Sequence, residues 1–418
     1  MPDVDAKARR DFAEEVVVKL RRAGFQALWA GGCVRDILLG LTPTDYDVAT
    51  DATPEQAMAT LPYRALAIGA SFGVVKVRHP RQKGNEVEVA TFRSDLAYVD
   101  GRRPVGVVYS SPREDAERRD FTINGLFMDP TTGEVIDHVG GRADLENRLL
   151  RAIGDPAARF EEDKLRLLRA ARFAARFGLT IEPTTWEAVR AMAPQIVVVS
   201  PERIAEELRK MLTHRLRARA TGLLMDAGLL SAVLPPFGAM DSEAQARAAR
   251  TLDLLPDAPS FPLAMAALLR EAGGPRVADD MARGLRLSNT ERERLVWLVR
   301  HQGCLIDAER LRASALKRLL ASAGIEELLA LHHAIALATD ADAGHVDYCR
   351  RYLARQPDGP IDPPPLLTGN DLIGHGLKPG PHFAAILEKV RDAQLESRVR
   401  DRGEALEYVD RELAAGLP

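Results

Sequence analysis

The sequence has little that would cross-link it, anchor it or give it one dominant charge. It contains three cysteines, which are too few and too widely spaced for a disulfide framework or a zinc site. Lys and Arg number 57 against 60 Asp and Glu, a net charge of −3, so a nucleic-acid partner would have to be held by a local basic face. No stretch approaches the roughly 20 apolar residues of a membrane span, and the charged N-terminus predicts no signal peptide. We therefore expect a cytoplasmic protein that contacts no membrane.

The composition is that of a folded protein with several domains. Hydrophobic residues make up 46% and charged residues 28% of the 418 residues, which excludes wholesale disorder. A prior of roughly 100–200 residues per domain gives two to four domains. A helical pattern at 5–22 precedes strand-like segments at 27–30, 45–49, 74–79 and 86–92. From the predicted cap at Asp155 to Gly178 the pattern predicts one long amphipathic helix, and helical patterns dominate from there to the end.

A diglycine turn followed by paired aspartates is the first chemical signature. The segment 29–40 reads WAGGCVRDILLG and the segment 44–50 reads TDYDVAT. The two glycines let the backbone approach a ligand closely, and the helix that follows points its N-terminus at that ligand. The two aspartates, two residues apart in a predicted strand, would present both carboxylates on one side, where oxygen ligands suit Mg²⁺. The predicted triphosphate and magnesium site comprises Gly31, Gly32, Arg35, Asp36, Asp45 and Asp47.

Two further clusters of charged residues stand at 118–124 and 159–173. The first reads RRDFTIN, an unusual density of hydrogen-bonding residues at the entry to an apolar element. In the second, Asp163, Arg166 and Arg169 recur every three residues and would form one stripe on a helix. In isolation each cluster is also typical of a solvated surface. Glu88, on a predicted neighbouring strand, is either a third catalytic acid or a solvent-facing residue.

In this order, the three motifs resemble those of the class II tRNA nucleotidyltransferases. That family comprises the CCA-adding enzymes and the bacterial poly(A) polymerases, within the polymerase β superfamily. The resemblance implies an α+β fold, with an N-terminal polymerase-β-like nucleotidyltransferase head that has a mixed, antiparallel-rich sheet, followed by an all-α neck, body and tail. The expected boundaries are 1–150 for the catalytic head, 151–212 for the neck with a nucleotide-selection helix, 213–358 for the body and 359–418 for a tRNA-binding tail.

The resemblance also implies residue roles. Asp45 and Asp47 would hold two Mg²⁺ ions, one activating the RNA 3′-hydroxyl and one holding the triphosphate, with Glu88 as a further catalytic acid. Arg119 would contact the triphosphate and Asp120 and Asn124 the ribose. The implied nucleotide-binding set is Gly31, Gly32, Arg35, Asp36, Arg119, Asp120, Asn124, Asp163, Arg166, Arg169 and Arg172. The block at 200–212 would have a structural role, closing the neck on the selection helix.

Asp163 and Arg166 would act as a protein template for the incoming base. The Watson–Crick edges of cytosine and adenine both offer an amino donor beside a ring-nitrogen acceptor, which an aspartate acceptor and an arginine donor complement. Uracil and guanine present the reverse order and would leave buried groups unpaired, at about 1–3 kcal/mol each. The expected function is template-independent transfer of CMP and AMP from CTP and ATP to the 3′ acceptor end of tRNA, building or repairing the CCA terminus.

Several alternatives stay open. The segment 93–104 resembles the family's loop that couples to the switch from C to A addition, which argues against an enzyme that adds only C. The segment 68–74 lacks the arginines typical of the poly(A) polymerases, which favours CCA addition, but an A-adding-only enzyme and a poly(A) polymerase are alternatives. The intact aspartates argue against a silent RNA-binding relative, and the long helical C-terminal part argues against a small-molecule nucleotidyltransferase. No protein partner is inferable, and His332 and His333 are expected to be ordinary helix residues.

Overall fold

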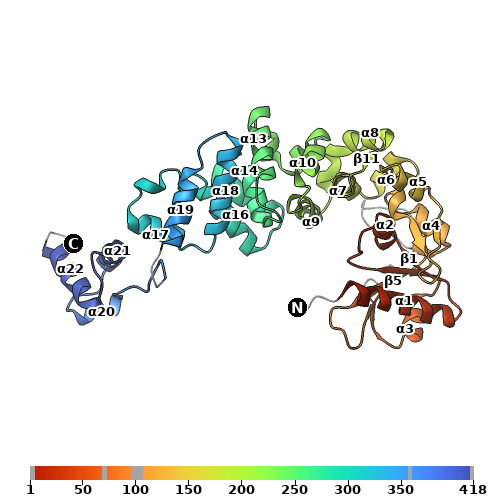
Figure 1. The fold of residues 1–418 in the computed structure, drawn as a ribbon, viewed down its shortest axis with the longest axis horizontal. Coiled ribbons are helices and arrows are strands. Elements are labelled where there is room, and N and C mark those ends of the chain that lie inside the picture. The colour runs from red at the N-terminus through yellow and green to blue at the C-terminus, as the bar shows by residue number, and fades with distance from the viewer. Residues whose placement is uncertain (1–4, 68–72, 96–106, 356–359, 415–418) are drawn as a thin grey trace. The chain divides into compact units, whose positions relative to one another are not determined.

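The computed structural model describes residues 5–67, 73–95, 107–355 and 360–414, which form two compact units (Figure 1). Unit 1 comprises Met1–Met211 with Arg219–Gly238, and unit 2 comprises Leu212–Ala218 with Ala239–Pro418. Unit 1 contains the main sheet and unit 2 is helical. This mixed head with a helical remainder confirms the predicted fold class, whereas the boundaries between neck, body and tail stay a prediction.

A seven-stranded sheet organises the head. Its strands follow the order β3-β4-β5-β2-β1-β8-β9, and only β2 and β5 pair in parallel. The bounds are Ala27–Ala30 for β1, Asp47–Thr50 for β2, Arg64–Ala67 for β3, Val74–Arg78 for β4, Glu86–Thr91 for β5, Leu126–Met128 for β8 and Val135–Asp137 for β9. Two small sheets pair β6 (Arg93–Asp95) with β7 (Val107–Tyr109) and β10 (Leu149–Leu150) with β11 (Thr180–Ile181). The sheet is therefore mixed and rich in antiparallel pairs, as expected.

Helices cover one face of this sheet because their apolar stripes have no other place to be buried. Helix α1 (Ala6–Arg22) begins where the Asp5 side chain accepts the N–H of Lys7, and it buries Phe12, Val16 and Leu20. It packs on β1, β2 and β5, while α3 (Pro54–Thr60) packs on β4 and β5. The remaining head helices are α2 (Gly32–Leu38), α4 (Pro112–Glu117) and α5 (Gly141–Glu146).

Two local predictions are wrong in detail. The expected single helix from Asp155 to Gly178 is two helices, α6 (Pro156–Glu162) and α7 (Leu165–Phe177), because Asp163 takes an extended conformation with φ −150° and ψ 102°. Its Oδ1 accepts the N–H of Leu165 at 3.1 Å, which satisfies a free donor at the start of α7. Strand β2 begins at Asp47, so Asp45 lies in the turn before the strand and not on it. The other helices of this region are α8 (Pro183–Met192), α9 (Pro201–Leu212), α10 (Arg217–Asp226), α11 (Leu229–Val233) and α12 (Pro235–Gly238).

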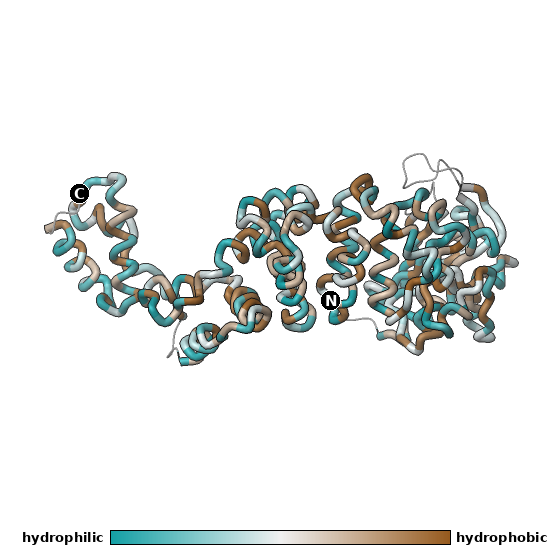
Figure 2. The backbone as a smooth tube through the Cα atoms, turned by 90° about the horizontal axis from the view of Figure 1, so that it is seen from above, coloured by the Kyte–Doolittle hydropathy of each residue, from teal (hydrophilic) through white to brown (hydrophobic). Residues whose placement is uncertain are grey.

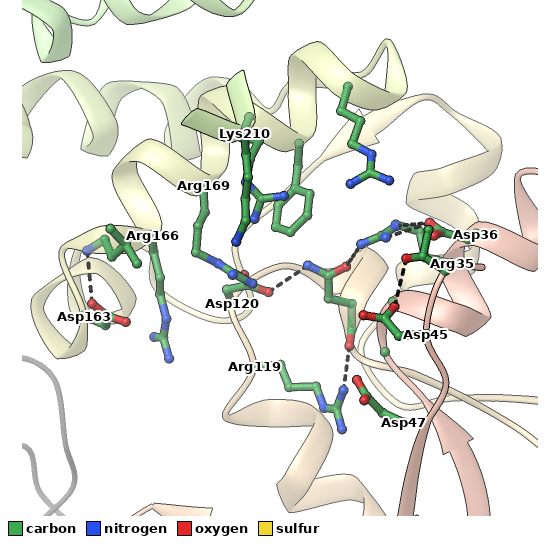
Figure 3. A pocket seen from close by; sticks show the side chains of 18 of the residues that line it. Arg35, Asp36, Asp45, Asp47, Arg119, Asp120, Asp163, Arg166, Arg169 and Lys210 are labelled. Atoms are coloured by element: carbon green, nitrogen blue, oxygen red, sulfur yellow. Dashed lines mark hydrogen bonds and ion pairs between the residues drawn. The ribbon is translucent and has the colours of Figure 1, made fainter. Parts of the chain in front are cut away.

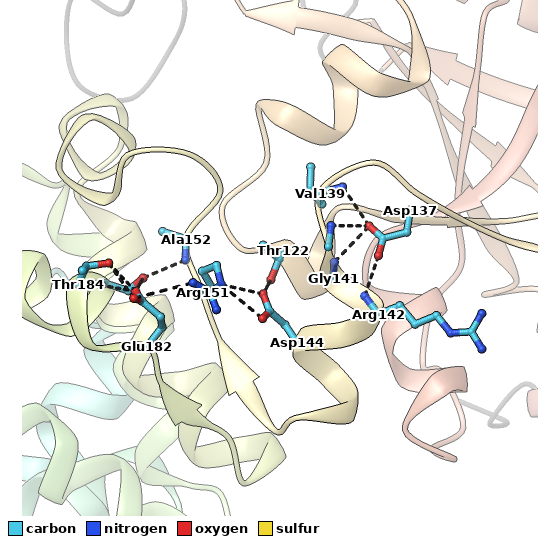
Figure 4. Close-up of polar contacts among 12 residues, drawn as sticks. Thr122, Asp137, Val139, Gly141, Arg142, Asp144, Arg151, Ala152, Glu182 and Thr184 are labelled. Carbon is cyan, nitrogen blue, oxygen red and sulfur yellow. Dashed lines mark hydrogen bonds and ion pairs between the residues drawn. The ribbon is translucent and has the colours of Figure 1, made fainter.

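Side-chain caps fix the junction between the head and the helices that follow it (Figure 4). Arg151 donates from Nε to Asp144 of α5 at 3.2 Å, and Asp144 also accepts from the Thr122 hydroxyl at 2.7 Å. On the other side, Glu182 accepts the N–H of Thr185 at 2.8 Å and so caps α8. Although burial alone would raise the pKa of Glu182, hydrogen bonds to it lower that pKa to about 2. Glu182 therefore keeps its charge at this junction throughout the physiological pH range.

Unit 2 is a succession of helices, along which polar and apolar stretches alternate (Figure 2). They are α13 (Ser242–Asp253), α14 (Phe261–Leu269), α15 (Gly274–Gly284), α16 (Asn289–His301), α17 (Ala313–Leu320), α18 (Ile325–Ala338), α19 (Gly344–Ala354), α20 (Gly369–Gly374), α21 (His382–Leu395) and α22 (Arg402–Ala414). The last three helices share a small core of their own, which includes Leu372, Val390 and Val409. Arg318 of α17 donates to Asp392 of α21 at 2.9 Å and ties these helices to the rest of the unit.

Within the described ranges, no single helix is long and apolar enough to cross a membrane. Helices α17 and α18 meet that test only as a pair, by length and composition, and they are bent by 103° relative to each other. The three cysteines are free thiols, and burial raises the pKa of Cys33 to about 12.

We predict that His332 makes the stability of unit 2 sensitive to acid. Its Nε2 donates to the His301 carbonyl at 3.1 Å, and its Nδ1 lies 3.3 Å from Nε2 of His345. Burial lowers the pKa of His332 to about 4. Between the unfolded pKa of about 6.5 and this value only the unfolded chain binds the proton, so stability falls as the pH falls, by up to about 3 kcal/mol.

Urea unfolding of the protein between pH 7.5 and pH 4.5 measures this effect. His332→Gln should flatten the loss of stability with falling pH, whereas the control His333→Gln on the same helix should keep it. Equal pH dependence in both variants would contradict the assignment.

Candidate active site

A pocket of about 620 Å³ opens in unit 1, between the end of the sheet and the helices α7 and α9 (Figure 3). Nine of its lining residues are cationic and five are carboxylates, an excess of positive charge that suits a polyanion. Every predicted nucleotide-binding residue and both predicted metal-binding aspartates line it. The lining is Gly31, Gly32, Arg35, Asp36, Thr44, Asp45, Asp47, Arg118, Arg119, Asp120, Asn124, Asp163, Leu165, Arg166, Arg169, Arg172, Phe173, Arg176, Arg203 and Lys210.

The carboxylates of Asp45, Asp47 and Glu88 gather at one end of the pocket. Glu88 does not line the pocket, but it pairs with Asp47 across β5 and β2 in the same register. Burial, together with the charges of Asp45 and Glu88, raises the pKa of Asp47 to about 6. A cation bound among these carboxylates would favour the charged form of Asp47 and lower its pKa.

The donor set fits a hard divalent ion such as Mg²⁺. Carboxylate oxygens are its preferred protein ligands, and Mg²⁺ usually takes one or two carboxylates and completes its shell with water and substrate phosphates. The described ranges contain no group of three or more His, Cys, Asp or Glu placed to hold a metal on their own. The structure therefore supports Asp45 and Asp47 as the residues that would hold the ion, with substrate oxygens completing its coordination.

The diglycine turn has a steric reason for its composition. Gly31 has a φ of +70°, and a Cβ built there would lie 2.6 Å from Nη1 of Arg119. Arg119 in turn donates to the Asn124 carbonyl at 3.1 Å and to Asp115 of α4 at 2.8 Å. Any side chain at Gly31 would therefore displace a guanidinium from the pocket wall as well as strain the backbone.

Arg35 is held in place by the protein and is almost completely buried. It donates to Asp36 from Nε at 2.9 Å and Nη2 at 2.6 Å, and from Nη1 to Asn124 Oδ1 at 2.6 Å. Its guanidinium also lies 4.2 Å from the centre of the Phe177 ring. The predicted nucleotide-binding residue Arg35 thus also connects the diglycine turn to α7.

Asp120 is the carboxylate at the centre of the pocket wall. Its Oδ1 accepts from Asn124 at 2.9 Å and its Oδ2 accepts from Nε of Arg169 at 2.7 Å. Burial alone would raise the pKa of Asp120, but Arg169 and Asn124 lower it to about 2. These contacts fix the Asn124 amide, which is a candidate partner for a ribose hydroxyl.

The predicted template residues lie on either side of the break between α6 and α7. Asp163 sits at the break, so its expected place on one helical stripe with Arg166 and Arg169 is wrong, although all three border the pocket. Arg203 of α9 binds Asp163 with two donors, at 3.1 Å and 2.6 Å. Arg166 donates to Glu162 at 2.6 Å, to the Arg159 carbonyl at 2.7 Å and to the Arg118 carbonyl at 3.3 Å.

These contacts leave hydrogen-bonding capacity on both template residues. Of the five N–H donors of an arginine, Arg166 uses three in the contacts given above. A carboxylate has about four acceptor sites, and the Asp163 contacts to Leu165 and Arg203 use three. Both side chains are therefore oriented by the protein and can still meet the edge of a base.

Several residues that line the pocket, or that bind its lining residues, escaped the sequence analysis. They are Asp115, Arg118, Arg176, Arg203, Glu207 and Lys210. Arg203, Glu207 and Lys210 share one face of α9, at spacings of four and three residues. That helical spacing is the pattern from which the sequence could have predicted them. Glu207 accepts from Arg172 at 2.5 Å in a buried pair. The block at 200–212, expected to close the neck and stabilise the selection helix, supplies the carboxylate that balances Arg172 and the guanidinium that orients Asp163.

Comparison with known proteins agrees with this geometry. Residues 27–151 match the poly A polymerase head domain, and residues 178–240 match the probable RNA and SrmB-binding site of polymerase A. The head of this chain is thus similar to the poly A polymerase head domain, which confirms the resemblance to class II tRNA nucleotidyltransferases that the motifs predict.

The particular relatives are CCA-adding enzymes. That of Geobacillus stearothermophilus is 40% identical over 235 residues, covering 56% of this chain and 57% of the relative. That of Streptococcus pyogenes serotype M2 is 43% identical over 198 residues, covering 47% and 48%. The matched regions thus span about half of the length of these curated relatives. The crystal structure of the Bacillus stearothermophilus CCA-adding enzyme in complex with CTP aligns over 97% of this chain and 98% of that one, with a TM-score of 0.79 and 29% identity.

We predict that removing the charge of Asp47 stabilises the ion-free protein. At pH 8 the Asp47 carboxylate is ionised and repels the neighbouring carboxylates. Asp47→Asn removes this repulsion and should raise the melting temperature in EDTA by about 2–4 °C. Added Mg²⁺ with CTP should stabilise the wild type more than the variant. Differential scanning fluorimetry measures both effects, and Glu117→Gln, an exposed acid on α4, is the control. An unchanged or lower melting temperature for Asp47→Asn would contradict the carboxylate crowding.

Proposed function

We propose that this protein adds CMP and AMP from CTP and ATP to the 3′ end of tRNA, without a nucleic-acid template, and so builds or repairs the CCA terminus. The observation that carries the proposal is one pocket with crowded carboxylates at one end and the oriented pair Asp163 and Arg166 at the other. The arginines between them suit a triphosphate. A tRNA substrate would also be consistent with a cytoplasmic location, which we include in the proposal.

The chain's own residues account for binding and orientation. Arg119 borders the pocket beside Asp47 and would bind phosphate oxygens, while Asn124, fixed by Asp120 and Arg35, would bind the ribose. Asp163 and Arg166 would then bind the base edge, so that the sugar and base are fixed before reaction. Mg²⁺ held by Asp45 and Asp47 would supply the positive charge that activates the attacking hydroxyl and stabilises the triphosphate.

Incubation of the protein and Mg²⁺ with tRNA transcripts ending before CCA or after CC, with CTP and ATP supplied separately and together, tests the proposal. Three nucleotides added to the shorter transcript, and none beyond, is the expected result. Addition of A only to the CC-ended transcript would indicate an A-adding enzyme, and an unbounded A tail would indicate a poly(A) polymerase; either result would overturn CCA addition. Asp45→Asn should abolish transfer while tRNA binding in EDTA stays within about twofold.

Arg203 is predicted to be a positioning residue for base selection. Loss of the two hydrogen bonds from Arg203 should let the Asp163 carboxylate rotate. The loss of one hydrogen bond to the base, at about 1.4 kcal/mol, corresponds to a tenfold change in selectivity. Arg203→Gln should therefore lower the preference for CTP and ATP over UTP and GTP about tenfold, measured as ratios of kcat/KM. Arg203→Lys keeps the charge and should restore part of the preference.

Arg209→Gln is the matched control for this experiment. Arg209 lies on the same helix α9 but pairs with Glu206 on the surface at 2.8 Å. If Arg203→Gln lowered kcat/KM equally for all four nucleotides and left the selectivity unchanged, Arg203 would have a purely structural role.

A further inference from the structure

The outer strands β3, β4 and β5 present a polar face beside the candidate catalytic carboxylates. Buried residues alternate with polar ones along β4 and β5, and the buried set is Val75, Val77, Val87 and Val89. Helices α1 and α3 pack against these strands (Figure 1). Because directly paired residues on neighbouring strands point to the same face, the register identifies the side chains that share the opposite, polar face.

The first row on this face begins at Asp47. Asp47 pairs with Glu88, and Glu88 pairs with Lys76 of β4. Neighbouring strands lie about 4.8 Å apart, so the backbone of Lys76 is roughly 10 Å from that of Asp47. The Lys76 ammonium lies 3.2 Å from Glu86 and 3.5 Å from Glu88. A cation therefore follows directly after the carboxylates along the row.

The second row lies one pleat further along the strands and is dominated by arginine. Glu86 pairs with Arg78, and Arg78 pairs with Arg64 on the outermost strand β3. Arg78 contacts Glu86 at 2.7 Å, whereas the exposed Arg64 stands directly opposite Arg78. Like charges in this position destabilise a sheet, and an anion bound between the two guanidinium groups would remove that cost.

The turn between β4 and β5 extends the same positive surface. Arg81 and Lys83 are exposed in this turn. Together with Arg64, Arg78 and Glu86 they line a surface hollow of about 550 Å³. None of these residues lines the pocket that contains Asp45 and Asp47, so the hollow is a separate feature that continues the open face of the sheet.

We propose that this basic strip, defined as Arg64, Lys76, Arg78, Arg81 and Lys83, binds the phosphate backbone of the RNA strand whose 3′ end is extended. The inference rests on the proposed function, which places that 3′ end at Asp45 and Asp47. The strand would leave the carboxylates across β5, β4 and β3, and its phosphates would meet the cations in turn. The nucleoside triphosphate is a poorer occupant, because the arginines of the main pocket already supply its site.

Kinetics with RNA of varied concentration test the strip. The triple variant Arg64→Ala, Arg81→Ala, Lys83→Ala changes only residues outside the main pocket. It should raise the KM for RNA about tenfold or more, while the KM for CTP and the kcat at saturating RNA stay within twofold. Because each single-strand phosphate contact contributes about 0.7 to the slope of log affinity against log salt, that slope should fall by about 2.

The matched control removes three exposed cations elsewhere in the head, in Arg22→Ala, Arg113→Ala, Arg142→Ala. It should leave the KM for RNA and its salt slope close to the wild-type values, and the single variant Arg64→Ala guards against misfolding of the triple variant. The proposal would be overturned if the strip variant had the same KM for RNA as the wild type. It would also be overturned if the variant raised the KM for CTP and not the KM for RNA.

Failure of the proposed function gives a different result. A wild-type protein that transfers no nucleotide to any RNA would contradict that function alone. Binding of labelled single-stranded RNA in EDTA would then still compare the strip variant with the control: weaker binding by the strip variant alone supports the strip, and equal binding overturns it.

Discussion

The arrangement of this pocket depends on how its arginines are held close together. Cations that line one cavity repel each other, and carboxylates in or behind the pocket wall offset this repulsion for several of them. Asp115 receives Arg118 and Arg119, Asp120 receives Arg169, and Glu207 receives Arg172. The carboxylates are contributed by the head and by α9, so the positive surface exists only when the head, α7 and α9 are folded together.

The same contacts connect the part of the pocket near Asp45 and Asp47 with the part near Asp163 and Arg166. Asp120 follows the loop after α4 and Arg169 lies on α7, and their bond at 2.7 Å joins the candidate ribose contacts to the candidate selection helix. Arg35 makes a second connection, since it binds Asn124 and stacks on Phe177 of α7. A base bound at Asp163, as we propose, would thereby be placed at a fixed distance from the carboxylates at Asp45 and Asp47. Fixed geometry of this kind is what a protein needs in order to select a base without a template strand.

The sequence was sufficient for residues whose partners are near in the chain or whose pattern is regular. The diglycine turn, the aspartates and the 118–124 cluster all reach the pocket as expected. The break at Asp163 was missed because neither glycine nor proline marks it, and the helical period continues through it; a side-chain cap to Leu165 produces it instead. Glu207 and Arg203 were missed as partners because they pair with Arg172 and Asp163, which lie 35 and 40 residues away in the chain.

Two aspartates of the same pocket show opposite shifts, and the contrast separates their roles. The pKa of Asp120 falls to about 2 because Arg169 and Asn124 already satisfy it. The pKa of Asp47 rises to about 6, because burial and neighbouring carboxylates outweigh the influence of Arg119. Burial acts on both in the same direction, so the difference comes from the partners that the fold provides. Asp120, which the fold pairs with an arginine, therefore serves to hold the pocket wall in place. Asp47, which the fold leaves among other carboxylates, is placed to bind a cation from outside the chain.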